Sequence, residues 1–270
     1  GNKVTIDMDA VNAWVDPDQL RVTTLQHEAA AASNITLASN GNVGIGTSSP
    51  AGKLSVIGST AAAAVNFDFG NNAAQAVGDT VTLRLLTSTA FVNAPTAAPY
   101  ISAIQTSAST SATDITFGTF NGSTLGERMR VDSAGRVTMP YQPAFYAMMN
   151  NTNVTGTAVI IFNNVFVNTG SVYNSSNGRF TAPVAGTYSF SANGLKRGGS
   201  GRLGFRKNGS YYGAGNSQAY HGGSVDSNFA ASIIITLAIN DYIEVFVSND
   251  AGDFYGNSNS HNGFSGYLIG

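Results

Sequence analysis

The chain of 270 residues contains no cysteine, and only 10% of its residues are charged, with a net charge of −2. The lack of cysteine excludes a disulfide framework and thiolate chemistry, and the lack of a basic cluster excludes a nucleic-acid-binding surface held by charge. The 31 glycines, together with many Asn, Ser and Thr residues, disfavour helices and favour short strands joined by tight turns.

The first 35 residues permit two interpretations. Asp16-Pro17 is typical of a helix start and predicts a short helix near residues 17–32. The segment 20–25 would also suit a strand, because Leu, Val and Thr follow one another there. We expect a short helix or ordered coil.

Residues 35–140 contain short, thinly apolar strand patterns separated by turn residues such as Asn40-Gly41. Strands this short need neighbours, and identical chains supply them most simply. We therefore expect residues 1–140 to form an elongated, intertwined, β-rich trimeric shaft. The predicted strands are 35–38, 43–47, 53–57, 65–69, 80–87, 100–105, 113–120 and 127–131.

Two segments of this region echo each other. Residues 37–43 read Leu-Ala-Ser-Asn-Gly-Asn-Val, and residues 131–137 read Val-Asp-Ser-Ala-Gly-Arg-Val. Both place a turn containing glycine between two strand patterns at the same spacing, which predicts a modular shaft.

Beyond Tyr141-Gln142-Pro143 the strand patterns become longer and richer in aromatic residues, so we place a domain boundary there. About ten strands over residues 141–270 is the density of a β-sandwich or jelly roll. The whole chain is therefore predicted to be all-β. The predicted strands are 144–148, 158–162, 165–167, 171–174, 179–182, 186–195, 202–207, 210–213, 228–237, 241–248 and 263–269.

Burial patterns in these strands differ. Tyr188 and Phe190 alternate with Thr187 and Ser189, which predicts one buried and one polar face. The segments 233–237 and 245–247 are apolar on both faces, so each needs a second cover, and a neighbouring subunit is the simplest one.

Several segments of the C-terminal part follow one another in an order that points to a known family. They are 143–147, 160–165, 173–174, 177–190, with Asn177-Gly178-Arg179-Phe180 and Gly186-Thr187-Tyr188-Ser189-Phe190, then Lys207-Asn208-Gly209, 240–245 and 264–269. With these segments the C-terminal part resembles the complement 1q-type, tumour-necrosis-factor-like jelly roll along nearly its whole length. The resemblance implies a trimeric jelly-roll head over residues 141–270.

The shaft resembles recurring elements of bacteriophage tail fibres in residues 40–50, followed by 53–56, and again in residues 127–135. The combination implies a homotrimeric tail fibre of a virion, joined to other tail proteins, whose head attaches to a glycan or protein on a bacterial host. Two alternatives remain: a head that serves only as a trimerisation knob, with receptor binding elsewhere, and a secreted lectin-like binding protein.

The predicted binding residues lie in three loops that strand counting places at the end of the head far from the shaft, at 196–201, 213–227 and 249–262. Aromatic rings beside small polar residues suit the apolar faces and hydroxyls of sugars. The same aromatic residues could instead anchor the loops or contact a neighbouring subunit. The candidates are Tyr220, His221, Phe254, Tyr255 and His261.

No cofactor is expected. His221 and His261 could share a metal, and Asp250 and Asp253 could hold calcium with loop carbonyl oxygens, although neither spacing is a recognised metal motif. No apolar run approaches the ~18 residues of a membrane-spanning helix, and no secretory signal is evident, so we expect no membrane insertion.

No enzymatic activity is predicted. The glycines at positions 41, 44 and 46 resemble a nucleotide-binding loop, but the Lys-Ser/Thr of such a loop is missing and no helix pattern follows. There is no Gly-x-Ser-x-Gly motif and no zinc-type histidine pair. The acidic residues of the head are expected in turns or on one exposed strand face, without a groove for a polysaccharide.

Overall fold

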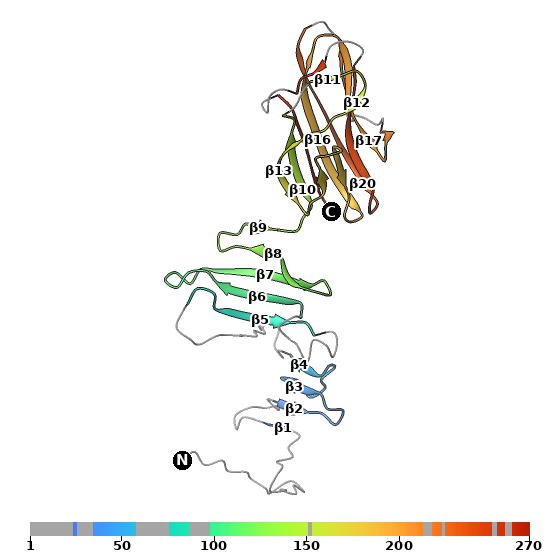
Figure 1. Cartoon of the computed structure of the whole chain (residues 1–270). Helices are drawn as coiled ribbons and strands as arrows, with labels where there is room; N and C mark the ends of the chain where they lie inside the picture. The colour runs from blue at the N-terminus through green and yellow to red at the C-terminus, as the bar shows by residue number, and fades with distance from the viewer. Residues whose placement is uncertain are drawn as a thin grey trace, which may run out of the picture. The chain divides into compact units, whose positions relative to one another are not determined.

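The computed structural model of the chain is shown in Figure 1. It describes residues 24–25, 35–57, 76–86, 98–150, 153–212, 218–222, 225–249, 253–256 and 261–270, with the backbone alone at 24–25, 218–222 and 249. All regular elements in these ranges are β-strands, which confirms the predicted all-β class. The chain divides into two compact units, residues 1–70 and 71–270. The boundary proposed at residue 140 lies inside the second unit and stays a prediction.

The first unit contains a small four-stranded sheet in the order β1-β2-β3-β4. Strands β1 to β3 pair antiparallel and β3 pairs parallel with β4. Strand β1 lies inside the segment 17–32, for which a helix is predicted. The prediction is wrong at Thr24 and Leu25, because their backbone pairs with β2. The other residues of the predicted helix lie outside the described ranges. The strands are β1 (Thr24–Leu25), β2 (Ile35–Leu37), β3 (Val43–Ile45) and β4 (Leu54–Val56).

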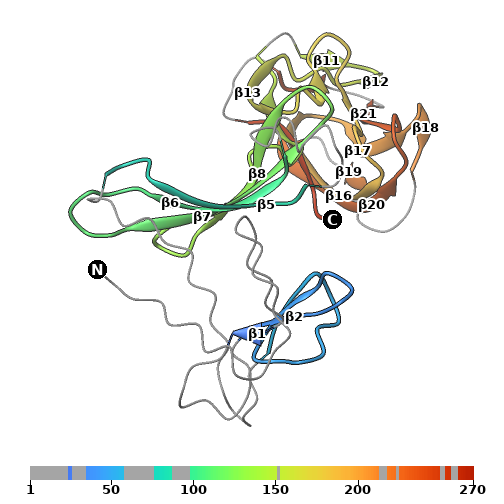
Figure 2. The same ribbon diagram turned by 90° about the horizontal axis from the view of Figure 1, so that it is seen from below.

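The second unit begins with an antiparallel five-stranded sheet, in sequential order from β5 to β9. Figures 1 and 2 show two of its strands, β6 and β7, lying side by side. The strands β5 to β8 fall within or beside a predicted range, and β9 is the strand that the echo in residues 131–137 predicts after its turn. The predicted strand 65–69 lies outside the described residues. The bounds are β5 (Thr80–Arg84), β6 (Tyr100–Gln105), β7 (Thr113–Phe120), β8 (Leu125–Val131) and β9 (Val137–Thr138).

The register of this sheet separates apolar from polar side chains. Residues directly opposite each other on paired strands share a face, as do residues two apart in one strand. We call the face that carries the two apolar rows the apolar shaft face. One row is Leu83, Ile101, Phe117 and Met129, and the next is Val81, Ala103, Ile115, Val131 and Val137. The opposite face carries the row Thr82, Ser102, Thr116, Arg130 and Thr138.

The internal echo in the sequence is a repeated hairpin. In the first copy Ala38 N donates to Asn42 O (2.9 Å), and Gly41 N donates to Ala38 O (2.9 Å). The equivalent atoms of the second copy form the same two bonds: Asp132 N donates to Arg136 O (2.9 Å), and Gly135 N donates to Asp132 O (2.8 Å). Gly41 and Gly135 have φ values of 78° and 81°, which favour glycine. The echo therefore corresponds to one turn used twice.

The head is formed by two seven-stranded sheets. The first head sheet has the order β11-β22-β16-β23-β10-β13, with β20 paired to β16. Its strands are β10 (Ala144–Met148), β11 (Val154–Thr155), β13 (Asn164–Thr169), β16 (Gly186–Arg197), β20 (Ser227–Leu237), β22 (Asp253–Phe254) and β23 (Gly263–Leu268).

The second head sheet has the order β14-β15-β21-β17-β18, with β12 paired to β21 and β19 to β17. Its strands are β12 (Ala158–Val159), β14 (Tyr173–Asn174), β15 (Arg179–Thr181), β17 (Ser200–Lys207), β18 (Ser210–Tyr211), β19 (Gln218–Gly222) and β21 (Tyr242–Asn249). Three of the head strands, β11, β19 and β22, were not predicted.

Aromatic side chains fill the space between the two head sheets. Tyr188 and Phe190 are buried, which confirms the predicted alternation along β16. Phe145 stacks on Tyr173 with ring centroids 4.8 Å apart, and Phe264 meets Phe145 edge-on at 4.7 Å. Such pairs add to the free energy gained from apolar burial and hold both sheets in one packing arrangement.

Candidate binding surface

The two ends of the head are defined by the chain itself. Leu268 N donates to Pro143 O (3.0 Å), and Thr187 N donates to Gly270 O (2.7 Å), so the first and last residues of the head meet at one end. The long strand β16 starts there at Gly186 and finishes at Arg197. We call the end at Arg197 the far end; in Figure 1 it is the end of the head near β11, opposite the C-terminus.

The far end is held by short pairings that converge on the last residues of β16. Strand β22 pairs with Lys196 and Arg197 on one side and with β11 on the other. The turn from β16 to β17 consists of Gly198 and Gly199, with φ values of 57° and 64°. The predicted loop 196–201 is therefore a tight two-residue turn between two strands, and it carries the chain from the first head sheet to the second.

Phe254 anchors this end of the head. Its side chain is buried and lies against Phe229, with ring centroids 5.9 Å apart. The prediction that Phe254 contacts a receptor is corrected by this burial, because the ring is already enclosed by its own chain. The alternative reading of this residue, a loop anchor, is the one that the structure supports.

Tyr255 and His261 are brought together on the surface. Their ring centroids lie 5.5 Å apart, and the guanidinium carbon of Arg197 lies 5.2 Å from the Tyr255 ring centroid. Tyr255 N donates to Leu195 O (2.8 Å), which ties the aromatic pair to β16. Arg197 Nε in turn lies 3.7 Å from Asp226 Oδ2. We call Arg197, Asp226, Tyr255 and His261 the far-end cluster.

The side-chain amides of Asn153 and Asn262 form hydrogen bonds that hold the segment carrying the cluster. Asn153 accepts a hydrogen bond from Gly256 N at Oδ1 (3.1 Å) and donates one from Nδ2 to Asp253 Oδ2. Asn262 donates to Met149 O (3.2 Å) and accepts from Met149 N. The segment carrying Tyr255 and His261 is thereby attached to the start of the head at two points.

The remaining predicted residues fall partly outside what the structure describes. Tyr220 and His221 pair through their backbones with Arg202 and Gly201 at the start of β17, close to the far end. Their side chains are not described. The predicted loop 213–227 is corrected, because it contains strand β19, whose pairing with β17 was not visible in the Gly- and Ser-rich sequence.

The calcium prediction stays a prediction. Asp250 lies outside the described residues, and Asp253 is hydrogen-bonded to Asn153. In the part of the chain that the structure describes, no three His, Cys, Asp or Glu side chains lie together as a metal site would require.

Lys196 is a buried cation that sequence reasoning missed. Its side chain is enclosed beneath the far end, and Nζ donates to Gly198 O (2.6 Å). Lysine is seldom fully buried unless its ammonium is hydrogen-bonded, so the turn carbonyl is part of what holds it. The pattern Leu195-Lys196-Arg197 at a strand end gives no signal for this arrangement.

The outer face of the first head sheet carries exposed apolar side chains. Tyr146 and Phe166 lie with ring centroids 5.6 Å apart, and Tyr267 and Ile234 are also exposed, Ile234 by 68%. This agrees with the prediction that the segment 233–237 has an uncovered second apolar face.

The segment 245–247 behaves differently from its prediction. Phe246 is only 8% exposed, because the Arg206 guanidinium lies 3.6 Å from its ring centroid and Tyr211 packs against its edge at 6.3 Å. The second cover of this strand therefore comes from the same chain, and the neighbouring subunit predicted for it is not required.

No helix of the described part is long and apolar enough to cross a membrane.

Comparisons with known proteins concern the head. Residues 144–269 match the family model of the C1q domain. The chain is similar to the globular domain of zebrafish complement 1qA protein, with 20% identity, a TM-score of 0.36 and coverage of 47% of this chain and 98% of that one. It is similar to murine APRIL, with 8% identity, a TM-score of 0.40 and coverage of 47% and 99%. It is also similar to Eiger TNF from S. frugiperda, with 12% identity, a TM-score of 0.37 and coverage of 48% and 93%. The family match and the two-sheet topology identify residues 144–269 as a C1q domain of the jelly-roll kind.

Proposed function

We propose that the chain is a homotrimeric attachment protein of a bacteriophage tail fibre, whose jelly-roll head binds a receptor on the bacterial surface through its far end. The observation that carries this proposal is the far-end cluster, in which Arg197, Tyr255 and His261 gather on a rigid β-frame. The tail-fibre part rests on the resemblance of residues 40–56 and 127–135 to such fibres. Domains of the C1q/TNF-like kind are typically trimeric binding modules without enzymatic activity, which agrees with this role.

The chemistry of the far-end cluster suits a polar ligand with apolar patches. A tyrosine ring gives a flat apolar surface, while Arg197 and Asp226 supply a cation and an anion that lie 48% and 56% exposed at its side. A surface glycan or a polar protein loop offers matching groups. The anchoring of the cluster by Phe254 and Asn262 reduces the entropy that binding would cost.

Three copies of the head in one trimer would raise the overall affinity of this surface for a cell. Linked weak sites raise the overall affinity through effective concentration, without any new contact. The exposed apolar side chains on the outer face of the first head sheet are suited to hold three heads together.

Binding of the labelled full chain to whole bacterial cells tests the proposal, with periodate-treated cells as the comparison and sedimentation to measure the assembly state. Binding lost after periodate supports a glycan receptor, and binding retained supports a protein receptor. A trimer that binds no plausible host would contradict attachment and favour a head that serves only as a trimerisation knob.

A further inference from the structure

In the five-stranded sheet of residues 80–138, the polar face is buried and the apolar face is exposed to solvent, which is unusual for a protein that acts as a single chain. On the apolar shaft face, Leu83 is 54% exposed, and Ile115 and Val137 are exposed as well. On the opposite face, Ser102, Asp114 and Thr116 are buried. An antiparallel sheet with one solvated face normally turns its polar side to water, so this sheet is inverted.

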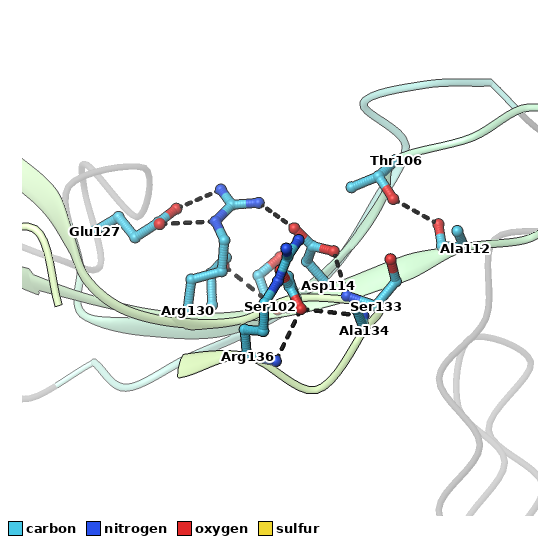
Figure 3. Close-up of polar contacts among 11 residues, drawn as sticks. Ser102, Thr106, Ala112, Asp114, Glu127, Arg130, Ser133, Ala134 and Arg136 are labelled. Atoms are coloured by element: carbon cyan, nitrogen blue, oxygen red, sulfur yellow. Dashed lines mark hydrogen bonds and ion pairs between the residues drawn. The ribbon is translucent and has the colours of Figure 1, made fainter. Parts of the chain in front are cut away.

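The polar side chains on the opposite face form their hydrogen bonds and ion pairs with other residues of the same chain. Figure 3 shows the Arg130 guanidinium between two carboxylates: Nη2 donates to Glu127 Oε2 (2.6 Å) and Nη1 to Asp114 Oδ2 (2.6 Å). The other Asp114 oxygen accepts from Ser133 N (2.9 Å). Ser102 Oγ and Thr82 Oγ1 lie 2.8 Å apart. Because these polar groups are already hydrogen-bonded within the chain, the polar face does not need a second chain to satisfy them.

Within the described ranges, no strand is paired or layered over the apolar shaft face, and several of its side chains are exposed. Its two rows carry no charged residue, and Arg128, from the bulge in β8, lies beside it, stacked on Tyr141 at 4.2 Å. A partner with a charged surface would lose solvation there without any compensating ion pair. The charge pattern therefore fits a partner face that is itself apolar and uncharged.

A second copy of the chain provides such a face. Identical apolar faces turned toward a common symmetry axis bury each other without leaving a charge unpaired, and closed symmetry is the usual form of soluble homo-oligomers. A sheet of this size also needs a second layer for its own stability, and none of the described strands forms one on this side.

We propose that the apolar shaft face is the surface through which copies of the chain associate in the region that precedes the head in the sequence, with the Arg130 network turned away from the contact. This inference rests on the proposed homotrimer and specifies which face of the five-stranded sheet lies inside it. The contact is separate from any contact between heads.

Strand β9 provides a matched pair for the test. Val137 and Thr138 are neighbours on this edge strand, both are exposed in the single chain, and they point to opposite faces. Because the natural sequence has no cysteine, a single introduced thiol is the only one that can react. The experiment measures maleimide labelling of Val137→Cys and Thr138→Cys in the folded full chain and again in denaturant, together with sedimentation of both variants.

We expect both variants to be trimers and the Val137→Cys thiol to react at least about tenfold more slowly than the Thr138→Cys thiol, because a thiol in an interface is shielded from the reagent. The two should react equally in denaturant. Trimers in which both thiols react equally would overturn this inference and leave the proposed trimer intact. Monomers, whatever their labelling rates, would overturn both.

Discussion

The ring of Phe254 occupies the space where any side chain at position 194 would lie: a Cβ at Gly194 would come within 2.0 Å of Phe254 Cζ. The lack of a side chain at Gly194 on β16 therefore makes room for the Phe254 ring on β22. This contact lies next to the far-end cluster, since Tyr255 follows Phe254 and Arg197 lies three residues after Gly194.

Replacing Gly194 with Ala should displace Phe254 and lower the free energy of unfolding by about 1–3 kcal/mol, the usual cost of overpacking a core. Chemical denaturation of the full chain measures this. Gly270→Ala is the control, because no heavy atom lies within 4 Å of the Cβ that it would add. Equal losses in the two variants would show that Phe254 has room to move aside.

The pair of Arg179 and Glu244 offers a second test. Arg179 Nε donates to Glu244 Oε2 (2.9 Å), and the Glu244 side chain is only 3% exposed. Arg179→Ala leaves this buried carboxylate without its cation, which should cost about 2–4 kcal/mol of unfolding free energy.

Arg136→Ala is the matched control for that variant. The Arg136 side chain is 78% exposed in its pair with Asp132, so its loss should cost less than about 1 kcal/mol. A loss from Arg179→Ala no larger than that of the control would mean that Glu244 is solvated or is held by other groups.

Acid should weaken the turn contacts of Asp241. Its pKa is lowered from 3.8 to about 2, first by Lys207, whose Nζ lies 2.8 Å away, and then by Asn208. The folded state therefore holds this proton less tightly than the unfolded state, so the stabilisation is present above pH 3.8 and is lost as the pH falls to about 2. Unfolding of Asp241→Asn should show a weaker pH dependence over this range than the natural chain; an identical dependence would contradict this assignment.

Local patterns predicted much of the fold. The alternation around Tyr188 and Phe190 correctly gave the buried face of β16, and the two seven-residue echoes correctly gave the hairpins at Gly41 and Gly135. These features depend on neighbours in the sequence, where periodicity and turn preferences are informative.

What the sequence did not predict depends on residues distant in the chain. Strands β11, β19 and β22 are short and exist because β16, β17 and each other lie beside them. The burial of Phe254 requires Gly194 and Phe229, and the cover of Phe246 comes from Arg206 through a cation–π contact. Arginine over an aromatic ring has no spacing rule in the sequence, so a neighbouring subunit was predicted instead.

The measurement that tests the account most directly is competition for host adsorption by a far-end variant, Arg197→Ala, Tyr255→Ala and His261→Ala combined in the full chain. Tyr211→Ala, which removes an exposed tyrosine outside the far-end cluster, is the control. The variant should sediment and unfold like the natural chain but compete at least about tenfold more weakly, since interface aromatic and arginine residues dominate binding energy. Competition equal to that of the natural chain and of Tyr211→Ala would contradict binding through the far end.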